Sequence, residues 1–449
     1  MANPRAGGAA AGSTYRSRPR AVLPALCTTQ ITSWGILYYA FPVLVTRISA
    51  DTGWTSRQVT AAFSAALLVS ALTGVLVGRL LDRRGPHAVM TTGSIAGVLA
   101  LVAVALAPNV SLFFAGWMVG GAAMAATFYP PAFAAVTRWH GEGRVRALTI
   151  LTLAGGLAST VFAPITAALA GHLSWRVTYL VLAAILAAVT IPLHALALRH
   201  PWPPASHAPA EPSGAVLPGQ PARTRPFVLL AAAFTLSSFA MYAVVFGLIP
   251  LLTERGASPT TSAWALGLGG LGQTLGRTLY AAIARRTPPA TRTAALIASG
   301  GVTTALLALV PGPVSLLVIL AVLAGTVRGN LTLLQATAVT DRWGTAAYGH
   351  LSALLAAPST TAAALAPWAV AALAPANGGH PALFAVLAAL SAAAAALALR
   401  TAPPRRRGSA GPMRPAVAQR RVLPAQAGVN QSAGTPGRAP GFLLRGRGS

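Results

Sequence analysis

The sequence predicts an all-α integral membrane protein whose twelve transmembrane helices form two pseudo-symmetric halves of six helices each. Of its 449 residues, 55% are hydrophobic and only 9% are charged, whereas about 25% of residues are charged in soluble domains. Apolar runs of about 20 residues, the length of a helix that crosses a bilayer, recur along the chain. None of these runs alternates between polar and apolar residues as the strands of a membrane β-barrel do.

The apolar runs divide into twelve expected helices. The first run is too long for the core of a signal peptide, so we expect it to remain as helix 1. The expected spans are 21–45, 58–80, 88–107, 110–136, 147–170, 176–198, 226–252, 262–284, 293–310, 313–338, 346–373 and 380–399.

The longest internal break is rich in proline and can form neither a helix nor a packed core. Such a linker lets two halves rock against each other about a central site. We expect the C-terminal tail, rich in Arg, Pro and Gly, to be disordered, with contact to anionic lipid as the weaker alternative. The expected parts are a cytoplasmic N-terminal tail at 1–20, a six-helix half at 21–199, a cytoplasmic linker at 200–225, a second half at 226–400 and the tail at 401–449.

Basic residues alternate between the two sides of the predicted membrane. The net charge of +27 could indicate nucleic-acid binding, but the arginines lie in the tails and in alternate loops rather than in one basic domain. Cytoplasmic loops carry an excess of Arg, so we expect the cytoplasmic (inner) membrane, both termini in the cytoplasm, and no nucleic-acid partner. The arginine-poor side has only Arg47, Arg57, Arg176 and Arg255.

A charged turn separates the second and third expected helices: Gly78-Arg79-Leu80-Leu81-Asp82-Arg83-Arg84-Gly85-Pro86-His87. Its pattern, Gly-x-x-x-Asp-Arg-x-Gly-x-Arg/His, resembles the signature loop of the major facilitator superfamily, the twelve-helix secondary transporters. The resemblance implies that Gly78, Asp82, Arg83 and Gly85 form a conformational latch that stabilises the outward-facing state, in which the two glycines permit tight packing and a sharp turn. The corresponding turn of the second half, 284–288, lacks an acidic residue, so we expect a one-sided latch.

Two arginines fall inside expected helices, Arg277 in helix 8 and Arg328 in helix 10. Such a residue costs at least about 2.5 to 3.5 kcal/mol to insert, so its default interpretation is a functional site facing a watery cavity. No acidic residue lies within the expected spans, and a guanidinium without an acidic partner matches a carboxylate substrate. Polar Asn330 lies close to Arg328. For Arg277, an equally good alternative is that the side chain reaches the cytoplasmic surface.

Gln273 and Arg277 are four residues apart and share one helical face. The pair resembles the Asp-x-x-x-Arg of helix 8 in monocarboxylate transporters, with glutamine in place of an aspartate that is implicated in proton coupling in that family. Glutamine cannot titrate, so substrate orientation could survive here and coupling at this position could not. Helix 1, with Gln30 and Tyr38 in the run 30–42, also looks like helix 1 of the oxalate/formate antiporter and monocarboxylate transporter group. We therefore place Gln30 and Tyr38 at the substrate site.

These observations predict a secondary active transporter of a small organic anion that works by alternating access, and the expected anion is a monocarboxylate. We expect no enzyme activity, cofactor or metal site, because no catalytic or phosphate-loop motif is present and the histidines, His194 among them, fall near helix ends. A coupling proton or counter-substrate is a possible further partner; coupling through a peripheral acid such as Asp341 or Glu254, through the substrate's own proton, or not at all stays open. The alternatives are an exporter of drug-like compounds or a secondary metabolite, and a membrane sensor that does not transport.

Overall fold

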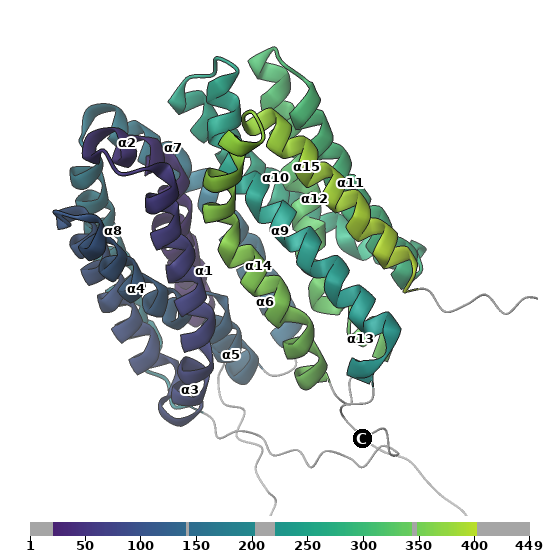
Figure 1. The fold of residues 1–449 in the computed structure, drawn as a ribbon. Coiled ribbons are helices and arrows are strands. Elements are labelled where there is room, and N and C mark those ends of the chain that lie inside the picture. The colour runs from purple at the N-terminus through teal and green to yellow at the C-terminus, as the bar shows by residue number, and fades with distance from the viewer. Residues whose placement is uncertain (1–20, 141–142, 203–220, 344–347, 402–449) are drawn as a thin grey trace, which may run out of the picture. The chain divides into compact units, whose positions relative to one another are not determined.

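The computed structural model describes residues 21–140, 143–202, 221–343 and 348–401. Both expected tails, apart from the first residue of the second one, and most of the expected linker lie outside this part of the chain. The described residues of the first half form α1 (Val22–Trp34), η1 (Gly35–Tyr39), α2 (Ala40–Thr52), α3 (Ser56–Leu106), α4 (Val110–Thr127), α5 (Tyr129–His140), α6 (Arg144–Gly156), α7 (Ala158–His172) and α8 (Trp175–Ala197) (Figure 1). The second half forms η3 (Pro221–Arg223), α9 (Arg225–Glu254), α10 (Pro259–Arg286), α11 (Pro289–Leu309), α12 (Val314–Thr337), α13 (Thr340–Trp343), α14 (Tyr348–Ala376) and α15 (His380–Leu399).

Ten of the described helices are long and apolar enough to cross a membrane, with α1 to α2, α4 with α5 and α6 with α7 each taken as one. One of the ten, α3, is 51 residues long and contains both spans expected at 58–80 and 88–107. It bends at Gly85, whose φ of 75° is left-handed, and Pro86 begins the second segment. The 28-residue α10 completes the twelve segments; it is less apolar than the others because Gln273 and Arg277 lie among its glycines.

Three segments of the first half are interrupted. The first has a π-helical turn, η1, between α1 and α2. The span expected at 110–136 breaks at Phe128, just before Pro130 and Pro131, because proline cannot donate to the preceding turn. The span expected at 147–170 breaks at Leu157. A break in a helix leaves backbone carbonyls near the middle of the bundle without their usual hydrogen bonds within the helix.

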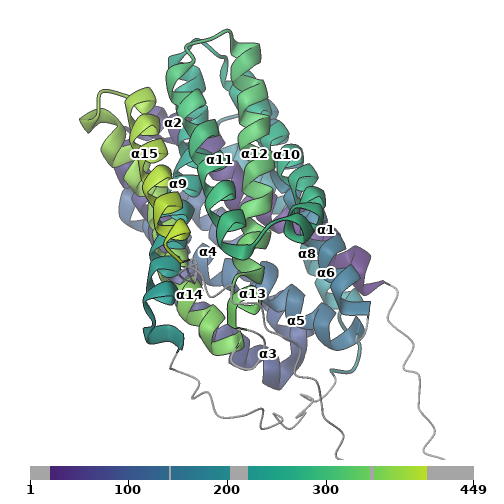
Figure 2. The same ribbon diagram turned by 90° about the vertical axis from the view of Figure 1, so that its right-hand side faces the viewer.

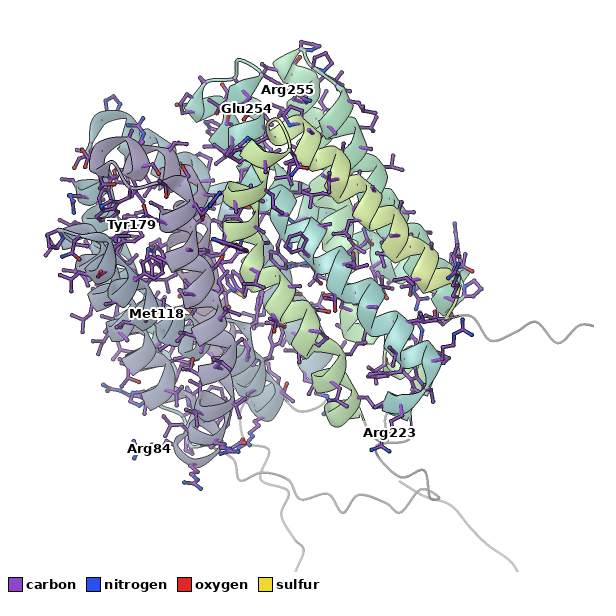
Figure 3. All side chains as sticks on the ribbon, viewed as in Figure 1. Arg84, Met118, Tyr179, Arg223, Glu254 and Arg255 are labelled. Atoms are coloured by element: carbon purple, nitrogen blue, oxygen red, sulfur yellow. The ribbon has the colours of Figure 1, made fainter. Side chains whose placement is uncertain are left out.

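The bundle has two ends. We use "linker end" for the one at which α3 bends, α5 and α8 end and α9 begins, and "far end" for the opposite one. Figure 3 shows Arg84 and Arg223 at the linker end and Glu254 and Arg255 at the far end. Two far-end arginines donate to terminal helix carbonyls, where a cation also complements the helix dipole. Arg176 donates to Ala105 and Ala107 at 2.8 and 2.9 Å, and Arg255 donates to Leu307 and Ala308.

Aromatic side chains pack the interior of the first half. The rings of Phe41 and Phe63 stack with centroids 4.1 Å apart, and Trp117 meets both edge-on. All three residues are buried. Such pairs add specific geometry to ordinary apolar burial, so rings from α2, α3 and α4 fix how these helices sit together.

Backbone contact joins α10 and α12 in the second half, and Figure 2 shows these helices side by side. Their interface is made of glycine: a Cβ atom at Gly325 would lie 1.9 Å from the carbonyl oxygen of Gly269, and one at Gly276 would lie 2.0 Å from that of Thr326. Small residues of this kind let membrane helices approach closely.

The two halves contact each other through α3 with α14 and α7 with α10. The backbone N–H of Trp368 donates to Ser64 Oγ at 3.0 Å, and Thr160 donates to the Gly267 carbonyl at 2.8 Å. Each of these residues lies nearer the far end of its segment. Toward the linker end of the first segment of α3, Leu72 and Val75 are 75% and 62% exposed. These two hydrogen bonds therefore join the halves toward the far end.

Candidate functional site

Two adjoining cavities lie on the linker-end side of the contacts between the halves. The larger, about 410 Å³, has an aromatic wall from the first half that includes Trp34, Tyr38 and Phe128. The other, about 300 Å³, lies in the second half, and hydroxyl and amide groups such as those of Ser238 and Gln335 line it. Tyr242 of α9 lines both cavities, together with residues of α14. The pair thus offers an apolar ring surface on one side and hydrogen-bonding groups on the other.

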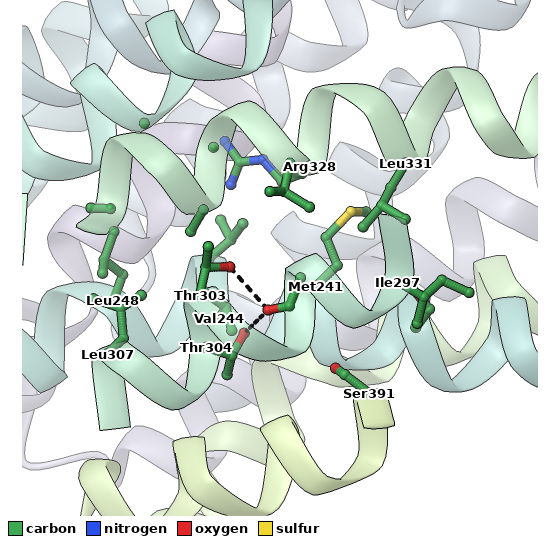
Figure 4. A pocket seen from close by; sticks show the side chains of 18 of the residues that line it. Met241, Val244, Leu248, Ile297, Thr303, Thr304, Leu307, Arg328, Leu331 and Ser391 are labelled. Atoms are coloured by element: carbon green, nitrogen blue, oxygen red, sulfur yellow. Dashed lines mark hydrogen bonds between the residues drawn. The ribbon is translucent and has the colours of Figure 1, made fainter. Parts of the chain in front are cut away.

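Arg328 lies on α12 beside the glycine interface. Its Nε donates to Gln273 Oε1 on α10 at 3.1 Å. Its Nη2 is buried and has no hydrogen-bond acceptor among the described residues. Arg328 lines a third cavity of about 40 Å³ within the second half, where Thr303, Thr304 and Ser391 lie opposite (Figure 4). That space is large enough for water but not for an organic molecule.

Arg277 lies one turn beyond Gln273 and is only 7% exposed. Its Nη1 donates to the Thr152 carbonyl of α6, in the other half, and its Nε is buried without an acceptor in the described part of the chain. Arg277 therefore links the halves. The side chain does not extend to the surface, because its guanidinium is held against α6.

Glycine at two positions of α6 makes room for this contact. A Cβ at Gly155 would lie 2.3 Å from the Tyr129 hydroxyl, and one at Gly156 would lie 3.2 Å from Arg277 Nη1. The Tyr129 hydroxyl and the Arg277 guanidinium are thus the groups that pack against these two glycines.

Gln273 connects the two arginines into one cluster, because it bonds Arg328 and shares a helical face with Arg277. The acidic side chains whose partners are described bind elsewhere: Asp82 pairs with Arg138, Asp341 with Arg292 and Glu254 with His380, while Asp51 accepts from Trp175. The cluster of Arg277, Gln273 and Arg328 thus carries positive charge without a carboxylate partner among the described residues, an arrangement that favours a visiting anion.

Tyr38 lies on η1 and lines the larger cavity. Its ring contacts those of Trp34 and Tyr242, with centroids 5.3 and 6.5 Å apart. Tyr242 lies close enough to interact electrostatically with both Arg277 and Arg328. Sequence reasoning missed Tyr242, although a tyrosine in the middle of an apolar helix could have signalled it.

Gln30 and Asn330 line neither of the two larger cavities, and the same is true of Gln273, Arg277 and Arg328. Gln30 is fully buried, and its Nε2 donates at 2.7 Å to the Thr127 carbonyl, which the ring nitrogen of Pro131 cannot bond. Asn330 is 4% exposed and donates to the Thr326 carbonyl one turn back at 3.0 Å. The described geometry brings Arg277, Gln273 and Arg328 together, sets Tyr38 near them, and gives Gln30 a backbone partner.

Two features of the expected turn are present in the structure, while its role as a latch stays a prediction. Asp82 pairs with Arg138 of α5, and Gly85 makes the sharp turn. Tight packing at Gly78 was wrong for this conformation, because nothing lies within 4 Å of a Cβ built there. Arg83 is exposed.

The one-sided latch stays a prediction, although the second half also has an ion pair at its linker end. Arg292, in the first turn of α11, pairs with Asp341 of α13. The acidic residue missing from the turn at 284–288 comes from the end of another helix. The two halves thus have ion pairs at corresponding places with the charges exchanged.

His194 was expected at a solvated helix end but is fully buried in α8. Its Nδ1 lies 2.8 Å from Ser94 Oγ of α3. The helix continues past His194, so this turn of α8 still packs against α3.

The described residues thus form candidate membrane segments in two joined halves with cavities beside their contacts, an arrangement typical of membrane transporters. Comparison with known proteins agrees. The profile described as Major Facilitator Superfamily matches residues 26–354. The chain belongs to the major facilitator superfamily.

Similar proteins extend this assignment only in part. An uncharacterized MFS-type transporter of Bacillus subtilis strain 168, YcxA, is 27% identical over 146 residues, which is 32% of this chain and 35% of that protein. An uncharacterized 38 kDa protein in a 23S RNA operon of Thermoproteus tenax is 26% identical over 134 residues, 30% of this chain and 36% of its own. The chain matches about a third of the length of these relatives.

Two solved structures share the fold at low sequence identity. A bacterial homologue of the human lysosomal transporter Spinster, in an inward-facing and unoccupied conformation, has a TM-score of 0.65 at 17% identity and covers 86% of this chain and 94% of its own. A mutant of the nucleoside transporter NupG has a TM-score of 0.67 at 14% identity, and the match covers 85% of this chain and 99% of that one. Likeness at this level concerns the fold.

Proposed function

We propose that this transporter moves an organic anion bearing a carboxylate, and that Arg328, Arg277 and Gln273 bind the charged group. One observation carries the proposal. Two guanidiniums in the membrane interior each keep a buried N–H group without an acceptor among the described residues, and no carboxylate there accompanies them. An unpaired buried charge is unfavourable, so binding of an anion would lower the free energy of this cluster.

The cavity walls refine the class of substrate. Binding cavities for drug-sized ligands span about 300 to 1,000 Å³, and the larger cavity here holds about 410 Å³ beside rings of Trp34, Tyr38 and Phe128. A monocarboxylate with an apolar or aromatic body fits this space better than formate or oxalate. We assign Tyr38, which lines this cavity, a role as hydroxyl donor to the carboxylate.

Alternating access follows from the arrangement of the halves. Arg277 holds the Thr152 carbonyl across the interface, and a carboxylate is a stronger acceptor for a guanidinium than a carbonyl is. An arriving anion would therefore compete for this contact and loosen the halves. The proposed division is into halves at 21–199 and 226–400, joined by the linker at 200–225.

We propose the orientation of the protein in the membrane from the distribution of its arginines. The linker end has most of the described arginines, and the far-end Arg176 and Arg255 are already bound to helix carbonyls. Positive residues favour the cytoplasmic side, so we place the linker end and both termini in the cytoplasm of a cell with this protein in its inner membrane. In that orientation the cavities are on the cytoplasmic side.

Coupling to a proton or a counter-substrate is part of the proposal. Asp341 and Glu254, the peripheral acids considered for coupling, each hold an ion-pair partner at opposite ends of the bundle, away from Gln273. A substrate that brings its own proton, or exchange for a second anion, fits this arrangement better than relay through either acid.

Export of drug-like or secondary-metabolite compounds is the second candidate. The aromatic wall of the larger cavity favours it, because rings stack with apolar compounds of many shapes. In that case the arginines would serve to join helices and halves, and neutral compounds would be carried as well as acids.

Uptake of labelled acids into proteoliposomes tests the proposal. The panel contains formate, oxalate, lactate, pyruvate and benzoate, each with and without an imposed pH gradient, and wild type is compared with Arg328→Ala and Arg328→Gln. Exposed Arg286→Gln, at the linker end of α10, is the matched control. Saturable uptake of acids that both Arg328 variants lose and the control keeps would support an anion carrier. Uptake of a neutral aromatic compound in preference to every acid would instead favour the exporter.

A further inference from the structure

A separate cavity of about 420 Å³ lies at the linker end of the first half. The bend of α3 contributes Arg84, Gly85, Pro86 and His87. The chain at and beyond the end of α8 contributes Leu198, Arg199, His200 and Trp202. None of these residues lines the central cavities, so this space is not part of the proposed transport site.

Every ionisable side chain that lines this cavity is basic: two arginines and two histidines. The nearest carboxylate along the chain, that of Asp82, is already paired with Arg138. The second segment of α3 begins at Pro86, directly at the cavity, so the positive end of its helix dipole adds to the charge. The field in this cavity therefore attracts an anion.

Trp202 gives the cavity a fixed wall. A Cβ at Gly85 would lie 3.1 Å from its ring, and the Arg138 guanidinium lies 4.4 Å over that ring. The Nε1 of Trp202 is buried and has no acceptor among the described residues. His87 is also positioned, because its Nε2 lies 3.0 Å from the Ala195 carbonyl. The walls are set by contacts that do not use the guanidiniums of Arg84 and Arg199.

We propose that this cavity is a phosphate-binding site that takes the head group of an anionic phospholipid. A phosphate offers several acceptor oxygens to guanidinium donors. The site lies at helix ends, beside Trp139 and Trp202, and tryptophan favours the level of lipid head groups. Basic cavities between transmembrane helices on one membrane face are suited to acidic head groups. The inference does not depend on the identity of the transported substrate.

Native mass spectrometry of the full chain in detergent tests this site. The protein is titrated with short-chain phosphatidylglycerol, phosphatidylcholine or inorganic phosphate, and bound ligand and the thermal midpoint are measured. The variant is Arg84→Gln with Arg199→Gln, and Arg199→Gln alone is a milder second variant. The matched control is Arg285→Gln with Arg286→Gln, which removes the same charge at the same end of the other half.

We expect wild type and the control to prefer phosphatidylglycerol over phosphatidylcholine by about tenfold or more, since each arginine near an anionic head group contributes about 1 kcal/mol. The double variant should lose this preference while it keeps the thermal midpoint of the lipid-free protein, because both arginines are exposed. A preference that survives in the double variant would overturn the site. Binding of inorganic phosphate but not of phosphatidylglycerol would overturn the lipid assignment.

Discussion

Both halves of this transporter have glycine contacts between helix backbones, Gly121 with Ala66 in the first and Gly325 with Gly269 in the second, but the groups that pack around them differ. In the first half, rings of Phe41, Phe63 and Trp117 fill the space between broken helices. In the second, α10 and α12 meet backbone to backbone through glycine. An interface without side chains leaves the flanking positions of α10 and α12 free to carry Gln273, Arg277 and Arg328. The half in which α10 and α12 meet through glycine is therefore the one that holds the polar cluster.

The contrast extends to the interface between the halves. On α10, glycines face two partners: Gly269 and Gly276 contact α12, while Gly267 and Gly270 lie against Ser159 and its neighbours in the first half. A helix with smooth faces on two sides can slide or tilt with little steric resistance. We therefore expect α10 to be the element that transmits occupancy of the cluster to the contact between Arg277 and Thr152.

The largest effect is expected where the glycine contact is closest. Gly325→Ala places a Cβ where the Gly269 carbonyl oxygen is 1.9 Å away, so the helices must separate and the cluster with them. We expect a loss of about 1 to 3 kcal/mol, the usual range for overpacking, measured as a lower thermal midpoint in detergent, and little transport.

Gly300→Ala on α11 is the matched control. Its new Cβ would lie 3.6 Å from Leu331 Cδ1, an ordinary contact, and alanine is the better helix former. Equal midpoints for Gly325→Ala and Gly300→Ala would show that backbone contact does not hold α10 to α12.

A carboxylate side chain placed in the cluster of Arg277, Gln273 and Arg328 should greatly weaken the cluster's affinity for an anion. Gln273→Glu puts a negative charge next to the Nε of Arg328, and a hydrogen bond to a charged group is worth about 1.5 to 3 kcal/mol. We expect carboxylate affinity to fall about 10- to 100-fold at neutral pH. Binding titrations at neutral pH measure the loss.

Gln58→Glu controls for added charge alone. Gln58 lies at the far end in a capping box with Thr55, and glutamate preserves that motif. A Gln273→Glu protein that binds carboxylates as tightly as Gln58→Glu would place the anion elsewhere.

The smallest effect is expected at the two linker-end ion pairs, which should contribute differently to thermal stability. Arg292 is 4% exposed and Asp341 27%, whereas Arg138 and Asp82 are 20% and 66% exposed. Removing an exposed partner costs about 1 kcal/mol or less, and stranding a buried charge costs more. Asp341→Asn should therefore lower the thermal midpoint more than Asp82→Asn. The reverse order would mean that the pair in the first half is the stronger structural contact.

Hydropathy and charge were enough to predict the all-helical fold in two six-helix halves, because crossing a bilayer demands long apolar runs. The spacing of Gln273 and Arg277 also predicted a shared face. What could not be predicted is tertiary: that α12 brings Arg328 to Gln273, that Thr152 accepts from Arg277, or that Tyr242 lines both cavities. Gln30 was assigned to substrate because it is polar in an apolar helix, yet the proline break in the neighbouring segment supplies its partner. Local sequence does not show which backbone groups another helix leaves unbonded.

We propose that the second half binds a negative charge through Arg328 and its neighbours. The most direct measurement is equilibrium binding of a carboxylic acid and of its neutral amide to wild type and to Arg328→Gln in the same lipid nanodiscs. We predict that wild type binds the acid at least about tenfold more tightly than the amide, the difference made by one charged hydrogen bond, and that Arg328→Gln binds both alike. Equal binding of acid and amide by wild type, or an unchanged preference in the variant, would contradict the account.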